Sequence, residues 1–169
     1  MTVRRYEAGE VTVLWDSSRC VHFAACVRAL PDVFDPRERP WVRPAGADTE
    51  ELMAAIRRCP TGALRYERRD GEPEPAELEA TIVPVPNGPL VVRGLLHVLT
   101  ADGETVARET RLALCRCGGT GNAPFCDGTH HTNHFRSRVP APSEARQRAA
   151  SPDDVAAPQE LDVPEGGAV

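Results

Sequence analysis

The chain has 169 residues and a formal net charge of −5 at pH 7. Only 5% of its residues are aromatic and 16 are prolines, so neither half can build a large hydrophobic core. The basic residues, all arginines, form no basic run with interleaved aromatic residues, which argues against nucleic-acid binding. No signal peptide or apolar run of ~20 residues is present, so we expect a cytoplasmic protein with no membrane partner. The complete lack of lysine is typical of high-GC coding and indicates a bacterial source.

Residues 1–70 are expected to form one small α+β domain that opens on a β-hairpin. Val11–Trp15 alternates apolar and polar residues as a half-buried strand does. The turn at Ala8-Gly9-Glu10 can fold this strand back on Val3–Tyr6.

Two short helices are expected after the hairpin. The first has apolar residues at i, i+4 and i+7 and ends before a proline, at Phe23, Val27, Leu30 and Pro31. The second opens on the capping pair Asp48 and Glu51, with Leu52, Ile56 and Cys59 on one face.

The second half of the chain is expected to be rich in β-structure. Residues 71–80 are acidic and proline-rich, which is typical of an extended linker. Within residues 81–139 the strand-like runs are 82–85, 90–99, 104–107 and 111–114, with a turn at 101–103. Residues 140–169 lack periodicity and predict a disordered tail.

Three cysteines and one histidine lie within sixteen residues after the last of these strands. Cys115, Cys117, Cys126 and His130 follow the spacing C-x-C-x8-C-x3-H. Three thiolates and an imidazole suit zinc or iron–sulfur chemistry. Structural zinc sites usually space their ligand pairs as C-x2-4-C, so the C-x-C spacing favours an iron–sulfur site.

This pattern, continued through Pro124 and Cys126-Asp127-Gly128-Thr129-His130, resembles the CDGSH iron–sulfur (mitoNEET-like) family. The resemblance implies a 2Fe-2S cluster with Cys115 and Cys117 on one iron and Cys126 and His130 on the other. It also implies four supporting residues, with a hydroxyl toward the sulfurs, a rigid turn, a cap and a flexible backbone, at Thr120, Pro124, Asp127 and Gly128.

A second set of cysteines lies in the N-terminal half, at Cys20, Cys26 and Cys59. Ferredoxins place C-x2-C-x2-C in a loop and add a distant Cys-Pro; here Phe23 stands at the middle position and Cys59 precedes Pro60. Residues 5–68, with their C-x-H-x3-C loop, resemble the divergent mono-cluster ferredoxin family. The resemblance implies a small ferredoxin-like α+β domain that holds one cubic cluster.

Two cluster types fit these three thiols. A 3Fe-4S cluster needs only the three cysteines, whereas a 4Fe-4S cluster requires His22 or a solvent ligand as well. The alternative without metal is three buried cysteines that act as small hydrophobic residues.

We therefore expect an α+β protein in which a ferredoxin-like domain precedes a CDGSH domain. The leading function is one-electron transfer between two clusters and to an unidentified redox partner protein. The alternatives are an iron–sulfur storage, transfer or redox- and pH-sensing module, and a zinc-bound structural adaptor. No catalytic motif is present, so we do not expect an enzyme. Homodimers are frequent among single-motif CDGSH proteins and are one expectation here.

Overall fold

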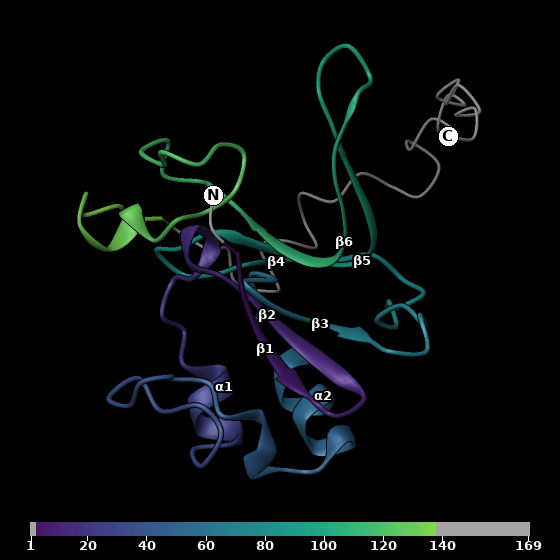
Figure 1. Cartoon of the computed structure of the whole chain (residues 1–169). Helices are drawn as coiled ribbons and strands as arrows, with labels where there is room; N and C mark the ends of the chain where they lie inside the picture. The colour runs from purple at the N-terminus through teal and green to yellow at the C-terminus, as the bar shows by residue number, and fades with distance from the viewer. Residues whose placement is uncertain (1–2, 138–169) are drawn as a thin grey trace.

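The computed structural model describes residues 3–137, which form two small antiparallel sheets of three strands each (Figure 1). One sheet has the strand order β1-β2-β3 and the other the order β4-β5-β6. Short helices accompany the first sheet, so the expected α+β fold class is confirmed. The expected disordered tail lies outside the described residues. Within residues 3–137 every helix is too short to cross a membrane.

The first sheet is built from the expected hairpin and one further strand. β1 (Val3–Ala8) and β2 (Val11–Asp16) pair with Ala8 opposite Val11, and Gly9 makes the turn with φ +53°. β3 (Leu64–Arg68) pairs with the other edge of β2. β3 was not expected from the sequence, because charged residues interrupt this short run.

A helix covers the first sheet and completes the N-terminal core. α2 (Thr49–Arg57) begins where the Asp48 carboxylate accepts a hydrogen bond from the Glu51 N–H at 2.9 Å, as the capping pair predicted. Its apolar face packs on the inward residues of β2 and β3. The largest fully buried members of this core are Val13, Val33, Phe34, Val42, Leu52 and Ile56.

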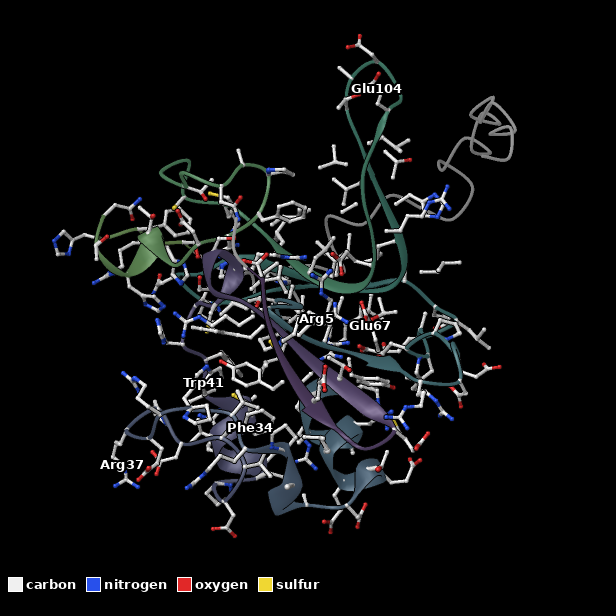
Figure 2. All side chains as sticks on the ribbon, in the orientation of Figure 1. Arg5, Phe34, Arg37, Trp41, Glu67 and Glu104 are labelled. Atoms are coloured by element: carbon white, nitrogen blue, oxygen red, sulfur yellow. The ribbon has the colours of Figure 1, made fainter. Side chains whose placement is uncertain are left out.

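The first expected helix is shorter than the spacing predicted. α1 covers only Ala25–Ala29, and the prediction that Phe23 belongs to it is wrong. His22 and Ala24 have φ values of 55° and 59°, so the backbone is left-handed there and a helix cannot include Phe23. The Phe23 side chain is 53% exposed. Beside α1, Phe34 and Trp41 pack together with ring centroids 6.0 Å apart (Figure 2).

The second sheet ends in a long hairpin that projects from the molecule. β4 (Thr81–Pro84) pairs with β5 (Leu90–Leu99), which pairs with β6 (Thr105–Leu114). Glu104 lies at the outer end of this hairpin (Figure 2). The expected break after residue 107 is wrong, because β6 continues through Arg108 to Thr110 and the charged side chains of Glu109 and Arg111 are buried against the first domain. Three 3-10 turns complete the elements: η1 (Ser17–Arg19), η2 (Pro44–Gly46) and η3 (Thr129–His131).

Glu109 of β6 carries an ion-pair network between the two domains. Its carboxylate accepts hydrogen bonds from Arg19 at 2.6 Å and from Arg65 at 2.9 Å. The Glu109 side chain is only 6% exposed, so the charge is compensated by the arginines rather than by water. The C-terminal sheet is therefore fixed on the N-terminal domain.

The acidic linker takes part in the same interface. Residues 71–80 form no helix or strand, yet the Glu74 side chain is nearly buried and pairs with Arg111 of β6. The linker therefore does not hold the two domains apart as an extended spacer would.

A substitution at Gly62 tests this packing. Gly62 lies against β6, and its own backbone is left-handed. A Cβ at Gly62 would lie 2.6 Å from the Arg111 carbonyl oxygen, whereas a Cβ at Gly9 would meet nothing within 4 Å; φ is +65° and +53° at the two positions. Gly62→Ala should lower the free energy of unfolding by about 3 kcal/mol and Gly9→Ala by about 1 kcal/mol. Urea unfolding measured by circular dichroism checks the difference. Equal losses would show that the domains do not pack closely at Gly62.

Candidate metal centres

The C-terminal ligand loop starts and returns at the end of β6. The Cys115 N–H donates to the Pro124 carbonyl at 2.9 Å, and the Cys126 N–H donates to the Ala113 carbonyl at 2.8 Å. These two bonds close the loop and bring Cys126 back beside the strand that leads into Cys115.

The four predicted ligands of this loop lie in two close pairs. The sulfurs of Cys115 and Cys117 are 3.7 Å apart, and the Cys126 sulfur is 3.3 Å from Nδ1 of His130. Two ligands on one tetrahedral metal at about 2.3 Å are about 3.8 Å apart, so each pair fits a separate metal atom. Within residues 3–137 no three His, Cys, Asp or Glu side chains converge on a single ion position. The chemistry of this donor set therefore fits a two-metal group better than a lone ion.

Asp127 and Gly128 shape the turn that leads into His130. The Asp127 carboxylate accepts from the Thr129 N–H at 3.0 Å, at the start of η3, and from the Gly121 N–H at 2.9 Å. Burial raises the pKa of Asp127, but these hydrogen bonds together with that from the Thr129 hydroxyl lower it to about 2. Gly128 has φ +91°, which favours glycine.

Thr120 and Pro124 differ in their support of the loop. The Thr120 hydroxyl donates to the Phe125 carbonyl at 2.8 Å and accepts from the Asn122 N–H, so the expectation that it points toward a sulfur is wrong. The backbone N–H of Thr120 contacts the Cys115 thiol instead. Pro124 lies in the turn, as expected, and supplies the carbonyl that Cys115 binds.

Backbone N–H groups surround the first thiol pair. Burial raises the pKa of Cys115, but the N–H groups of Thr120 and Gly118 and the Cys117 thiol bring it below its ordinary value. The Gly119 N–H donates to the Cys117 sulfur at 3.4 Å. The glycines of this loop therefore allow the chain to stabilise negative charge on sulfur.

His130 is buried and electrically neutral in this environment. It is 7% exposed, and burial together with the neighbouring His131 lowers its pKa although the Asp127 charge opposes the shift. Nδ1 faces the Cys126 sulfur, and a Cβ on Gly88 would lie 3.7 Å from Nε2. A neutral ring with Nδ1 toward the thiol is the form of histidine that binds metal.

The N-terminal cysteines converge from three elements on one cavity. Cys20 ends η1, Cys26 lies in α1 and Cys59 follows α2. All three line the same small cavity together with Trp41 and Thr61. The Cys59 sulfur is 3.6 Å from the Thr61 hydroxyl, which also accepts a hydrogen bond from the Ala63 N–H and so has its proton free for the sulfur.

His22 and Phe23 also line this cavity, and both are exposed. His22 therefore lies at the thiol site, but no contact with a sulfur orients its imidazole as a ligand. Two arrangements of the fourth metal corner are therefore compatible with the three thiols: a protein ligand, or a position open to solvent.

Two buried indoles beside the thiols test whether an inorganic cluster fits. Trp15 Nε1 and Trp41 Nε1 are buried with no nitrogen or oxygen partner among the described residues. Their rings pack edge to face with centroids 5.0 Å apart, and both line a second cavity that also contains Cys20 and Cys26. A buried N–H without an acceptor costs free energy. The Trp15 indole has the Cys20 sulfur beside it, and the sulfur of a cluster is the acceptor that this site would supply to Trp41. The residues present therefore fit an iron–sulfur group.

Burial favours the protonated thiol at Cys20 and Cys26 when no metal is bound. Burial raises the pKa of Cys20, although hydrogen bonds from the backbone N–H of His22 and from the indole of Trp15 oppose this shift. Burial and the neighbouring Cys59 raise the pKa of Cys26 to about 11. Metal binding at this site therefore has to displace protons from sulfur.

The two thiol sites lie on the same interface between the domains. Val21, next to Cys20, packs with Ala113 and Cys126 in a small buried cluster. The Asn122 amide donates to the Ser18 carbonyl at 3.3 Å. In Figure 1 the loop that follows β6 accordingly lies beside the segment that follows β2.

Sequence reasoning missed the residues that support the two sites from a distance. They are indoles, a hydroxyl and three arginines whose partners are remote in the chain: Trp15, Trp41, Thr61, Arg19, Arg111 and Arg116. Arg19 stacks over Phe125 at 4.6 Å, and Arg116 donates to the carbonyls of Gly88 at 3.0 Å and Val85 at 2.7 Å. The only signal in the sequence was that Arg19 and Arg116 are adjacent to predicted ligands.

Comparison with known proteins assigns the two halves separately. The family described as "Divergent 4Fe-4S mono-cluster" matches residues 6–69, and the family described as "Iron-binding zinc finger CDGSH type" matches residues 87–131. The uncharacterized protein YjdI of Escherichia coli strain K12 is 30% identical over 66 residues, which are 39% of this chain and 87% of that protein. YjdI of E. coli O157:H7 matches with the same identity and coverage. The matched stretches fall within the two domains expected at residues 1–70 and 81–139.

The opposite pKa shifts at the two sites predict different thiol reactivities in metal-free protein. At pH 8 only about one thousandth of Cys26, with its pKa near 11, should be thiolate, so iodoacetamide should modify Cys115 much faster than Cys26. Peptide mass spectrometry over time measures the order. Labelling in denaturant is the control, where both rates should become similar; faster labelling of Cys26 in folded protein would contradict the prediction.

Proposed function

The chain belongs to the divergent 4Fe-4S mono-cluster family and carries an iron-binding CDGSH-type domain after it, and from this premise we propose that it is a two-cluster protein of one-electron transfer. The observation that carries the proposal is the common interface of the two thiol sites. Val21 is adjacent to Cys20 and packs on Cys126, so one van der Waals contact separates the ligand loops of the two sites. An electron on either site has a short protein path to the other.

For the C-terminal site we propose a 2Fe-2S cluster, which would supply one-electron redox chemistry. The pairing of Cys115 with Cys117 and of Cys126 with His130 supports this assignment, since each pair can hold one iron. Imidazole is neutral where a thiolate would be negative, so His130 should raise the reduction potential relative to four thiolates. The separation of the four donors into two close pairs favours an iron–sulfur cluster over the zinc-bound adaptor.

For the N-terminal site the three thiols support a 3Fe-4S or a 4Fe-4S cluster. Cys20, Cys26 and Cys59 provide three corners, and the buried indoles of Trp15 and Trp41 provide N–H donors for sulfur. The exposed His22 at the cavity, or a solvent molecule, is available for a fourth corner.

Burial of His130 favours electron transfer over release of a cluster. Release on protonation requires access of protons to the imidazole, and this ring is 7% exposed beneath the turn that contains Gly88. Cluster transfer or pH sensing is therefore the second candidate. We propose a carrier that passes electrons to a redox partner protein and is not itself an enzyme.

Metal analysis and electron paramagnetic resonance test the two-cluster proposal. The purified protein should contain more iron than one 2Fe-2S cluster supplies, together with acid-labile sulfide. Cys59→Ser should remove the N-terminal signals and leave the optical bands of the C-terminal site. Near-stoichiometric zinc without sulfide, in protein made anaerobically with ample iron, would falsify the proposal.

The same measurement separates the two N-terminal cluster types. An oxidised 3Fe-4S cluster has an odd electron and gives a signal, whereas an oxidised 4Fe-4S cluster is silent. His22→Ala should leave the spectrum unchanged if His22 is only a neighbour. Conversion from silence to the odd-electron signal would make it the fourth ligand.

His130→Cys should lower the potential of the C-terminal site and slow its loss in acid. The thiolate adds negative charge, and it removes an imidazole that loses metal when protonated. Because the pKa of His130 is lowered in the folded protein, the stability it contributes is complete above the unfolded pKa of about 6.5 and is lost as the pH falls through the lower folded value. Midpoint potentials and optical decay between pH 5 and 8, a window set around the unfolded pKa of about 6.5, measure both effects. Identical pH profiles of the two proteins would mean that His130 is not a ligand.

A further inference from the structure

Arg111 is a buried cation of the C-terminal domain that binds the backbone of the N-terminal domain. It lies in β6 and is 2% exposed. Its guanidinium donates to carbonyl oxygens of Ile56 at 3.2 Å, Cys59 at 2.8 Å and Leu64 at 2.7 Å. These carbonyls span the segment that connects α2 to β3. The side chain therefore holds the two ends and the middle of the segment that carries Cys59.

Cys59 is fixed from two sides by this arrangement. Nε of Arg111 binds its carbonyl, while the Thr61 hydroxyl lies 3.6 Å from its sulfur. The Cys59 N–H donates to the Ile56 carbonyl at 2.9 Å. With the backbone of Cys59 held in this way, the direction of its sulfur toward Cys20 and Cys26 depends on Arg111.

The charge on Arg111 is partly compensated by the linker. Burial lowers its pKa only to about 10, so the guanidinium stays positive at neutral pH. Glu74 pairs with it from residues 71–80, and the Glu74 side chain is itself only 9% exposed. A buried positive charge and its buried counter-ion thus lie beside one ligand of the N-terminal site.

We propose that Arg111 is a positioning residue for Cys59 and that Arg111 and Glu74 together set the reduction potential of the N-terminal cluster. This inference rests on the proposed presence of that cluster. Reduction adds one electron and makes the cluster one unit more negative. The fixed positive charge of Arg111 stabilises the reduced form, and the negative charge of Glu74 opposes this stabilisation.

The two charges predict potential shifts of opposite sign. Arg111→Met removes the positive charge and should lower the midpoint potential, whereas Glu74→Gln leaves Arg111 uncompensated and should raise it. Each substitution should change the ratio of reduced to oxidised cluster at a fixed potential by about tenfold. For one electron this corresponds to a shift of about 59 mV in the midpoint potential. Arg111→Lys, which keeps the charge, should stay closer to the wild-type potential. A merely structural role would make both substitutions act in the same direction.

Arg93 offers a matched control in the same interface. It also binds a carbonyl at the end of α2, that of Arg57 at 3.3 Å, and pairs with a linker carboxylate, that of Glu77 at 3.7 Å. Its side chain is 30% exposed, so water screens its charge, and it makes no hydrogen bond to Cys59. Arg93→Met should leave the N-terminal potential unchanged.

The experiment is a dithionite titration of the full chain, followed by electron paramagnetic resonance, with the C-terminal signal as an internal reference that should shift less. Shifts of the same sign in Arg111→Met and Glu74→Gln, or no shift in Glu74→Gln, would overturn the inference. If Arg111→Met loses the cluster, Glu74→Gln and Arg111→Lys still decide. Wild-type protein without an N-terminal cluster would instead refute the proposed function. If the cluster is present but its potential is unchanged by all three substitutions, only the role of Arg111 is refuted.

Discussion

The docking of strand β6 on the segment around Cys59 is the contact on which the rest of the structure depends. Arg111 binds three carbonyls there, and Glu109 binds Arg19 and Arg65 on the same side. Because β6 leads directly into Cys115, one strand connects the ligand segment of the N-terminal site to the ligand loop of the C-terminal site. A disturbance of this strand is therefore expected to reach both sites.

The polar character of this interface follows from the composition of the chain. Few aromatic residues are available, and the N-terminal core uses the largest fully buried side chains apart from Leu112. The domains are joined instead by buried guanidinium and carboxylate groups, with Val21, Ala113 and Cys126 as a small apolar contact. Buried ion pairs give less net stability than apolar packing of equal area, because the charges lose hydration. They do impose a definite orientation of the two domains and so fix the two thiol sites relative to each other.

The two sites prepare their thiols in different ways. At Cys115 the chain offers backbone N–H groups that favour the thiolate, in a loop rich in glycine. At Cys20 and Cys26 burial favours the neutral thiol, and the N–H donors beside the sulfurs are the buried indoles of Trp15 and Trp41. The C-terminal loop is thus organised for negative charge by its own backbone, whereas the N-terminal site is lined by side chains from distant elements.

Local sequence determined the hairpin of β1 and β2, the cap of α2 at Asp48, and the close pairing of ligands spaced as C-x-C and C-x3-H, because each depends on residues a few positions apart. It did not determine the start of α1, where left-handed residues exclude Phe23, nor the unbroken course of β6, whose charged residues read as a break. Tertiary structure decided those outcomes. It also decided the common interface of the two sites and the contacts of Trp15, Trp41 and Arg111. A buried charge or a lone N–H is stable only where a partner remote in the chain lies against it, and a single sequence carries no record of that distance.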